Sequence, residues 1–459
     1  MVGRCERAHI GAPVYWWPIE GFDTPDLREA RPREAEKQKD PRWTDDPIYE
    51  HDAGLDAKID GNCPRMIALI IIRSADYELA QGSFLVFACW QRRLPHCAMQ
   101  DANRRSGQEI AMNQSQSKST PRKVALALQG GGSHGAFTWG VLDRMLEDET
   151  IDIIGATGTS AGATNAIVLA DGMVRGGPKH ARSELRQFWE AIGKMVGFNS
   201  FLPWPMSGET AANTPLDQNP LYVAATMLCR QLSPYDLNPL NYNPLRDRPI
   251  ELIDFEGLRK QNAFEVMICA TNVRTARRRV FQSADLSVDA VLASATLPQM
   301  MTAVEIDGET YWDGGFTGNP ATTNFLRRLP KCDLIVVRID PVHRDAVPRK
   351  PVEIVERMLE ISFNSTFWLE FSSLGFLSKL IDEGHLDRQR FGRFLFHGIE
   401  ASSLMEKFPQ SSKANNYPAM LEYLFDLGRQ TADAWLTRHG TDIGHRSTFD
   451  LQALLPIGF

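Results

Sequence analysis

The stretch that most constrains the fold is KVALALQGGGSHGAFTWG, residues 123–140. Its first seven residues form an apolar run with the length of a buried strand. Three consecutive glycines follow, and apolar residues at helical spacing begin directly after them. Because glycine lacks a Cβ, such a run permits a tight turn or a close approach of the backbone to another group. The stretch therefore predicts a strand, a glycine loop and a helix in direct succession.

The same alternation of strand and helix recurs further along the chain. Strands are predicted at IDIIGATG, FEVMICATNV and DLIVVRID, and helices at AGATNAIVLADGM and SVDAVLASA. Strands that alternate with helices favour a mostly parallel sheet that is covered on both faces. We therefore expect an α/β fold.

The N-terminal quarter of the chain differs from the rest. Residues 1–120 hold four of the seven cysteines and show no lasting periodicity, and residues 111–123 have the composition of a polar linker. We expect the folded part to begin near Lys123, with Met112 as the true initiator. A poorly patterned but genuine N-terminal domain is the alternative.

The remainder divides by composition into a core and a C-terminal region. Residues 121–345 predict the α/β core, and its Pro-, Asn- and aromatic-rich part at about 198–248 predicts a cap-like insertion. Residues 346–459 predict a helical region packed on the core. The second of its two long helices is expected to begin at Pro418 and to end at Gly440.

The composition excludes several classes of function. A formal net charge of −7 without a long basic block disfavours nucleic-acid binding. The scattered, odd number of cysteines predicts a reducing compartment and neither a disulfide framework nor a metal site. The most apolar run, residues 66–72, is too short to span a bilayer, and no signal peptide is evident. We expect a cytoplasmic protein without a cofactor.

The second predicted strand runs into a G-x-S-x-G motif formed by Gly158, Ser160 and Gly162. Small flanking residues let the chain turn sharply and present the serine hydroxyl at the carboxyl end of the strand. The start of the next helix adds backbone N–H groups that favour developing negative charge. The motif therefore predicts a nucleophilic serine.

A third glycine-rich junction supplies a carboxylate. Asp313 ends a short strand-like segment, and Gly314 and Gly315 follow it, so that its loop can pack tightly against another backbone. A serine hydroxyl needs a base at neutral pH. Together the three junctions predict one active site at the carboxyl edge of a parallel sheet.

The glycine loop alone permits two other interpretations. Gly130, Gly132 and Gly135 satisfy G-x-G-x-x-G after a strand, and Asp152 lies near the expected acidic position of a dinucleotide-binding unit. Alternatively, the glycines do no more than permit the tight turn between strand and helix. Neither interpretation explains GTSAG or WDGG.

The motifs GGGSHGAF, GTSAG and DGG, in this order, resemble those of the patatin-like phospholipases, in particular the bacterial branch. ATNVRT, ASATLP and YWDGGFTGNPA support the resemblance, which covers about residues 123–341 and does not reach residues 1–120. It implies a three-layer α/β/α fold and a Ser–Asp dyad in place of a triad. Ser160 would be the nucleophile and Asp313 its base.

The resemblance also implies an oxyanion hole made by backbone N–H groups of Gly131, Gly132 and Ser133. The implied reaction is hydrolysis of a lipid or other acyl ester through an acyl-enzyme, and we expect burial to raise the pKa of Asp313. One residue departs from the family pattern. His134 stands where the family commonly has Arg or Lys, and only a protonated histidine could attract an anionic head group.

Three alternatives stay open at this point. A Ser–His–Asp esterase or thioesterase is one, because five histidines lie downstream of Asp313: His343, His385, His397, His439 and His445. A lipid-binding pseudoenzyme is another, and a nucleotide-binding protein is the third. Residues 361–381 could lie on a bilayer, and without a basic face we expect such contact at the inner membrane face to be weak. The pattern says nothing about the oligomeric state.

Overall fold

The structure is a computed structural model of the chain, and it describes residues 120–195, 206–246, 250, 252–329, 332–391 and 394–451. The predicted N-terminal segment and the Met112 start lie outside these residues. Of the predicted cap-like insertion, the structure describes residues 206–246.

The described elements alternate as the sequence predicts, with additional short pieces. The strands are β1 (Arg122–Leu128), β2 (Ile151–Gly158), β3 (Glu265–Asn272), β4 (Arg278–Gln282), β5 (Val304–Ile306), β6 (Glu309–Asp313), β7 (Asp333–Arg338) and β8 (Phe396–Glu400). The helices before β7 are α1 (Gly135–Met145), α2 (Ala161–Lys194), α3 (Gly208–Asn213), α4 (Pro220–Gln231), α5 (Pro234–Leu237), α6 (Phe255–Lys260), α7 (Val288–Ser294) and α8 (Thr322–Leu326). Those after it are α9 (Pro351–Asp382), α10 (Arg388–Phe391), α11 (Ser402–Met405) and α12 (Pro418–His439).

The strands form one sheet in the order β5-β6-β3-β2-β1-β7-β8, and β4 pairs with β3 beside this path. The five strands from β3 to β8 in this order are parallel, whereas β4, β5 and β6 join in antiparallel pairs. The prediction of a mostly parallel sheet is confirmed. Strand β8 was not predicted, because residues 346–459 were expected to be helical.

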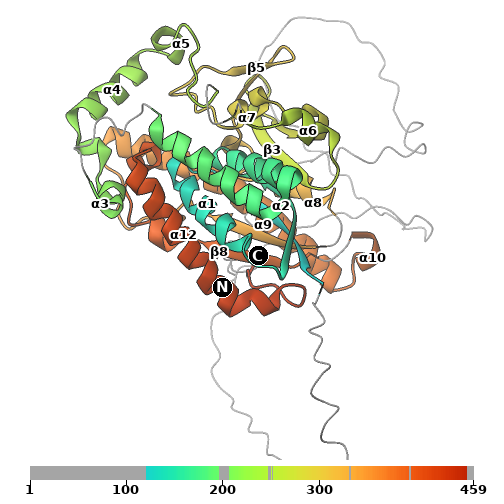
Figure 1. Cartoon of the computed structure of the whole chain (residues 1–459). Helices are drawn as coiled ribbons and strands as arrows, with labels where there is room; N and C mark the ends of the chain where they lie inside the picture. The colour runs from blue at the N-terminus through green and yellow to red at the C-terminus, as the bar shows by residue number, and fades with distance from the viewer. Residues whose placement is uncertain are drawn as a thin grey trace, which may run out of the picture. The chain divides into compact units, whose positions relative to one another are not determined.

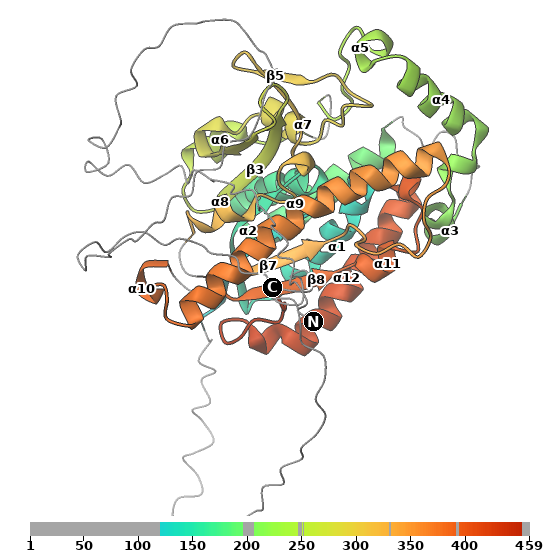
Figure 2. The ribbon, with the colours of Figure 1, turned by 180° about the vertical axis from the view of Figure 1, so that it is seen from behind.

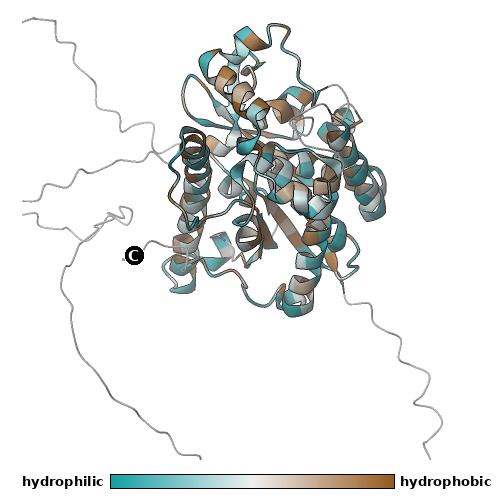
Figure 3. Cartoon of the chain, turned by 90° about the vertical axis from the view of Figure 1, so that its left-hand side faces the viewer, coloured by the Kyte–Doolittle hydropathy of each residue, from teal (hydrophilic) through white to brown (hydrophobic). Residues whose placement is uncertain are grey.

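Helices cover both faces of the sheet, so the fold has three layers. Figure 1 shows α1, α2 and α12 on one face, and Figure 2 shows α9 across the other. Side chains alternate accordingly along β1: Val124, Leu126 and Leu128 pack with the first group of helices, and Ala125 and Ala127 pack with the second. Figure 3 shows hydrophobic strands between helices of mixed hydropathy. This arrangement confirms the three-layer α/β/α prediction.

Helix α2 is a helical hairpin. Its backbone leaves helical geometry at Gly177, with φ of 74° and ψ of −164°, and Pro178 follows. The two arms pack closely, since a Cβ on Gly172 would lie 2.3 Å from the Cα of Ala181. Because the arms are antiparallel, the second arm returns to the level at which the first begins, directly after the predicted nucleophile.

Helices α1 and α12 cross with their backbones in contact. A Cβ on Gly140 would lie 2.0 Å from the carbonyl oxygen of Phe425, and one on Gly428 would lie 2.1 Å from that of Phe137. Glycine at both positions therefore sets the distance between the two helices. The glycine loop precedes α1 directly, so this crossing also holds the loop in place.

We expect Gly140→Ala to lower the free energy of unfolding by about 1–3 kcal/mol, because the added methyl group overpacks the crossing. In an open helix the same change would stabilise by about 1 kcal/mol. Gly193→Ala is the matched control, since its Cβ would meet side chains of Pro418 and Leu421 at ordinary distances of 3.4 and 3.5 Å. Chemical denaturation measures both variants. Equal stability of the two would contradict the close crossing.

Candidate active site

Ser160 lies at the turn between β2 and α2, in a conformation that few side chains adopt. Its φ of 55° and ψ of −124° fall outside the ordinary regions for an L-residue. The flanking glycines make this turn possible, because a Cβ on Gly158 would lie 2.1 Å from the carbonyl oxygen of Gly162. A Cβ on Gly162 would lie equally close, at 2.1 Å, to that of Leu128. The turn thus presents a half-buried hydroxyl at the carboxyl end of the sheet.

The register of β3 brings Asp313 to the same place. Strand β2 pairs with residues 265–268 of β3, and β6 pairs with residues 270–272. Strand β4 pairs with residues 267–271 of β3. This range overlaps the ranges that β2 and β6 use, so β4 lies on the opposite edge of β3. Consequently β6 takes up the edge of β3 where β2 leaves it. Asp313, opposite Ala270, therefore lies next to the turn that carries Ser160.

The Asp313 carboxyl group is fully buried. Burial raises its pKa to about 7, although the Gly315 N–H and the Ser160 hydroxyl lower it and the charge of Asp340 raises it further. The Gly315 N–H donates to Oδ1 at 2.8 Å, whereas Oδ2 has no hydrogen bond of normal geometry within the described residues. Ser160 and Asp313 are thus neighbours whose hydrogen bond is not closed, as is common in unliganded sites.

The two glycines after Asp313 permit tight packing of its loop. A Cβ on Gly314 would lie 2.1 Å from the carbonyl oxygen of Cys269 on β3, and one on Gly315 would lie 2.6 Å from the ring of Phe363 on α9. The prediction that these glycines serve close packing agrees with the geometry.

Arg278 on β4 braces the same loop and was not recognised in the sequence. Its guanidinium group donates to the carbonyl oxygen of Thr317 and pairs with Glu370 of α9. On the other side, the Thr159 hydroxyl donates to the carbonyl oxygen of Gly318 at 2.7 Å. The residue before the predicted nucleophile is therefore tied to the loop of the predicted base.

The glycine loop approaches Ser160 from β1. A Cβ on Gly130 would lie 2.8 Å from the Cβ of Ser160, so no side chain fits there. The N–H of Gly130 donates to Asn319. Those of Gly131, Gly132 and Ser133, the predicted oxyanion donors, have no acceptor among the residues that the structure describes. These amides are available to an oxygen atom of a ligand.

Two further glycines hold the loop against its surroundings. Gly132 has φ of 58°, and a Cβ there would lie 2.4 Å from the carbonyl oxygen of Lys413. A Cβ on Gly135 would lie 2.7 Å from the Cβ of Ala161, at the start of α2. The loop is therefore closed on one side by the 3₁₀ turn Gln410–Ala414 and on the other by the nucleophile turn.

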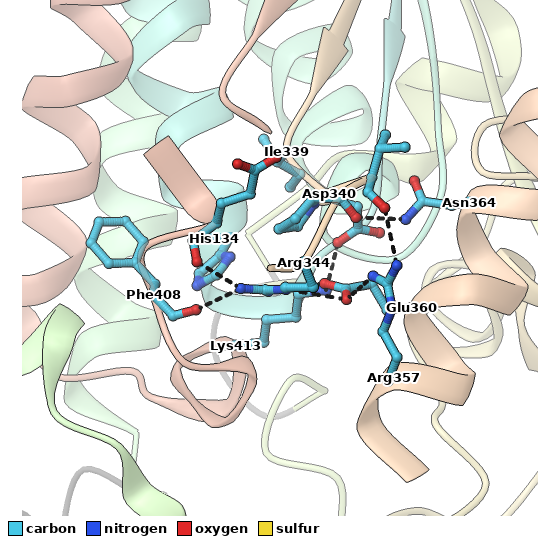
Figure 4. Close-up of polar contacts among 12 residues, drawn as sticks. His134, Ile339, Asp340, Arg344, Arg357, Glu360, Asn364, Phe408 and Lys413 are labelled. Carbon is cyan, nitrogen blue, oxygen red and sulfur yellow. Dashed lines mark hydrogen bonds and ion pairs between the residues drawn. The ribbon is translucent and has the colours of Figure 1, made fainter. Parts of the chain in front are cut away.

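His134 is buried in this loop (Figure 4). Burial lowers its pKa well below the usual value, and the positive charges of Lys413 and Arg344 lower it further. Its Nε2 lies 2.8 Å from the hydroxyl of Ser412. His134 thus attaches the loop to the 3₁₀ turn and does not present a positive charge to an anionic head group.

The five downstream histidines lie elsewhere. None contacts Ser160 or Asp313 within the described part of the chain, and four have acidic neighbours of their own. These pairs are His343–Asp345, His385–Glu383, His397–Asp333 and His439–Asp442. The open alternative of a Ser–His–Asp triad gains no support from this geometry.

Comparisons with known proteins give one match by sequence and several by structure. Residues 126–326 match the family model described as patatin-like phospholipase. The chain is similar to VipD from Legionella pneumophila, with 14% identity, a TM-score of 0.29, and coverage of 68% of this chain and 67% of VipD. It is also similar to ExoU of Pseudomonas aeruginosa in its complex with SpcU, with 16% identity and a TM-score of 0.22. That match covers 69% of this chain and 53% of the other, so this chain spans about half of its length. The search of curated proteins finds no match.

We expect Asp313→Asn to stabilise the protein in a pH-dependent way. A carboxyl group whose pKa is about 7 when folded and about 3.9 when unfolded loses folding stability as the pH rises between these values. The loss is on the order of 4 kcal/mol above pH 7 and is absent below about pH 4. Asparagine carries no charge at any pH. The difference in unfolding free energy between variant and wild type should therefore grow from pH 4 to 7 and then level off.

Denaturant titrations at several pH values measure this difference. Glu305→Gln, at an exposed carboxylate on β5, is the control and should show no such trend. If the stability difference for Asp313→Asn is the same at pH 4 and pH 8, ionisation of the buried carboxyl group does not destabilise the fold, and the raised pKa is contradicted.

Proposed function

We propose that the chain is a serine acyl hydrolase that cleaves lipid esters with Ser160 and Asp313, a proposal that the match of residues 126–326 to the patatin-like phospholipase family model supports. The observation that carries the proposal is the contact between the Ser160 hydroxyl and a buried carboxyl group whose pKa is about 7. At neutral pH about half of such groups are ionised, and the ionised form is a competent base.

The proposed reaction uses the groups that the site brings together. Asp313 accepts the proton of the Ser160 hydroxyl as Oγ attacks the ester carbonyl carbon. The carbonyl oxygen becomes negative and accepts hydrogen bonds from the amides of Gly131, Gly132 and Ser133. Protonated Asp313 then gives its proton to the leaving alkoxide, and an acyl-enzyme remains. Water, deprotonated by Asp313, attacks that ester, and the fatty acid leaves as Ser160 recovers its proton.

The surroundings of the site support an apolar substrate. Large apolar side chains are exposed on the described part of the insertion, among them Leu221, Met227, Leu240 and Tyr242. On α9, for whose residues 361–381 contact with a bilayer was one possibility, Ile354, Met358 and Ile361 are exposed at the spacing of one helix face. No helix among the described residues has the length and hydropathy needed to cross a membrane. We propose that these residues contact lipid weakly at a membrane surface.

We expect a fluorophosphonate probe to label the wild-type protein and not Ser160→Ala, because the probe reacts with an activated serine. Ser160→Ala and Asp313→Asn should lower kcat for a short-chain acyl ester by at least about 10³-fold. Ser183→Ala, at an exposed serine of α2, is the matched control and should retain both activities. Loss of labelling on replacement of any of the five downstream histidines by alanine, in a folded variant, would favour the triad instead.

The pH dependence of kcat/KM tests whether Asp313 is the base. Since the ionised form of Asp313 is required, kcat/KM should rise tenfold per pH unit below about pH 7 and become constant above it. Initial rates between pH 4 and 9 measure this limb. A midpoint near 4, as for an exposed carboxylate, would contradict the assignment of Asp313 as a buried base.

A further inference from the structure

One amide of the glycine loop is held by a side chain. Gly130 donates its N–H to Oδ1 of Asn319 at 2.8 Å, and Nδ2 of Asn319 lies 3.4 Å from Oδ2 of Asp340. Asn319 and Asp340 are both fully buried. Asn319 belongs to the loop after Asp313, so this bridge joins the loop of the proposed base to the proposed oxyanion loop.

Asp340 is itself fixed from two directions. Its backbone N–H and that of Ile339 both donate to Oε1 of Gln129, at 2.9 Å each. Gln129 is the residue directly before the glycine loop. On its other side, Oδ1 of Asp340 accepts from Nζ of Lys413 at 2.6 Å. Asp340 comes shortly after the end of β7, and these contacts hold its carboxylate in one orientation.

Lys413 connects this carboxylate to the outer side of the loop. Its backbone carbonyl oxygen is the atom that a Cβ on Gly132 would meet, and its ammonium group pairs with Asp340. Glu360 of α9 lies 3.8 Å from the same ammonium group and binds Arg344 and Arg357 at 3.0 and 2.6 Å (Figure 4). Two carboxylates and three cations thus form one connected ion cluster beside the glycine loop.

A buried ion cluster is a poor way to stabilise a fold, because desolvation of the charges offsets most of their attraction. The cluster lies next to the glycine loop and the loop after Asp313, and this position points to a role in the proposed active site. Burial raises the pKa of Asp340, and the contact with Lys413 opposes this and favours the ionised form. The charge of Asp340 in turn raises the pKa of Asp313.

We propose that Asp340, acting through Asn319, is a positioning residue of the proposed active site, which holds the glycine loop by the Gly130 amide and places a negative charge near Asp313. The inference rests on the proposed function. The clamp fixes the loop that carries the three remaining amides, and the charge makes Asp313 a stronger base. Gly130 is excluded as an oxyanion donor, because Asn319 occupies its N–H.

Other titratable and charged groups also lie around Asp313. On β3, burial raises the pKa of the Cys269 thiol to about 12, so it stays neutral throughout the relevant range. Arg278 of β4 and Glu370 of α9 neutralise each other in an ion pair. Ser160, on the remaining side, carries no charge. Among the residues that the structure describes, Asp340 is thus the negative charge that acts on Asp313, with Lys413 as its partner.

The decisive variant is Asp340→Asn, which keeps the shape of the side chain and removes its charge. We expect the midpoint of the acidic limb of kcat/KM to move about 1 pH unit lower, because a neighbouring like charge is lost. We also expect kcat to fall about 10–100-fold with little change in KM, since a displaced oxyanion loop affects the transition state more than binding. Asn319→Ser should give the same fall in kcat.

Asp333→Asn is the matched control. Asp333 is a buried carboxylate at the other end of β7, bound to His397 at 2.8 Å, and its replacement should leave the midpoint unchanged. An Asp340→Asn variant that unfolds cooperatively and keeps the wild-type midpoint would overturn the charge effect. If Asp340→Asn does not fold, Asn319→Ser decides, and an unchanged kcat in that variant would overturn the clamp.

These outcomes are separable from failure of the proposed function. Absence of ester hydrolysis by the wild-type protein, or full activity of Ser160→Ala, would reject the hydrolase proposal itself. A wild-type protein that depends on Ser160 and Asp313, with Asp340→Asn and Asn319→Ser indistinguishable from it in pH midpoint and kcat, would reject the further inference alone.

Discussion

The arrangement of this protein depends on three places where backbones meet without side chains between them. Gly130 lies against the carbonyl oxygen of Thr159, Gly162 against that of Leu128, and Gly314 against that of Cys269. The first two contacts lie at the carboxyl ends of the parallel strands β1 and β2, and the third joins the loop after β6 to β3. A methyl group at any of them would lie only 2.1–2.7 Å from the facing carbonyl oxygen, so it would push two loops of the site apart and lengthen the hydrogen bonds between them. The glycines therefore determine which polar groups can reach one another.

This packing has an energetic consequence for the polar groups that remain. Close contact excludes water, so the Asp313 carboxyl group must be protonated or bear the cost of a buried charge. The same exclusion lowers the pKa of His134 and requires paired charges around Asp340. Strain at Ser160 adds to this cost. The long apolar helices and the α1–α12 crossing supply the stability that offsets it.

The elements that sequence analysis predicted are those whose signals are local. Strands β1, β2, β3 and β7 are short apolar runs, and each glycine motif is complete within about ten residues. Strand β8 was missed because FHGIE has no distinctive pattern and is defined only by its pairing with β7. The hairpin in α2 was not predicted, because only its first arm was recognised and no local pattern says that the two arms pack together.

The parts of the site that were not predicted depend on distant residues. Asn319 stands in a segment that supported the family resemblance, yet its contacts are with Gly130 and with Asp340, which lies beyond another strand. Lys413 reaches the glycine loop from residues that follow α11. Neither the sequence spacing nor the residue type of these side chains predicts the contact, because the order of strands in the sheet brings them together. Sequence motifs point to the proposed reacting groups, and the topology of the sheet determines which residues hold them.

The environment of Asp313 also bears on the choice between a dyad and a triad. In a triad the carboxylate orients a histidine, so both oxygens should be hydrogen-bonded and the pKa should be low. Here Oδ2 has no such partner among the described residues, and burial raises the pKa to about 7. These are properties of a carboxyl group that itself exchanges a proton with a neighbour. Since Ser160 is that neighbour, these properties favour the proposed dyad, in which the buried carboxyl group takes the part that histidine has in a triad.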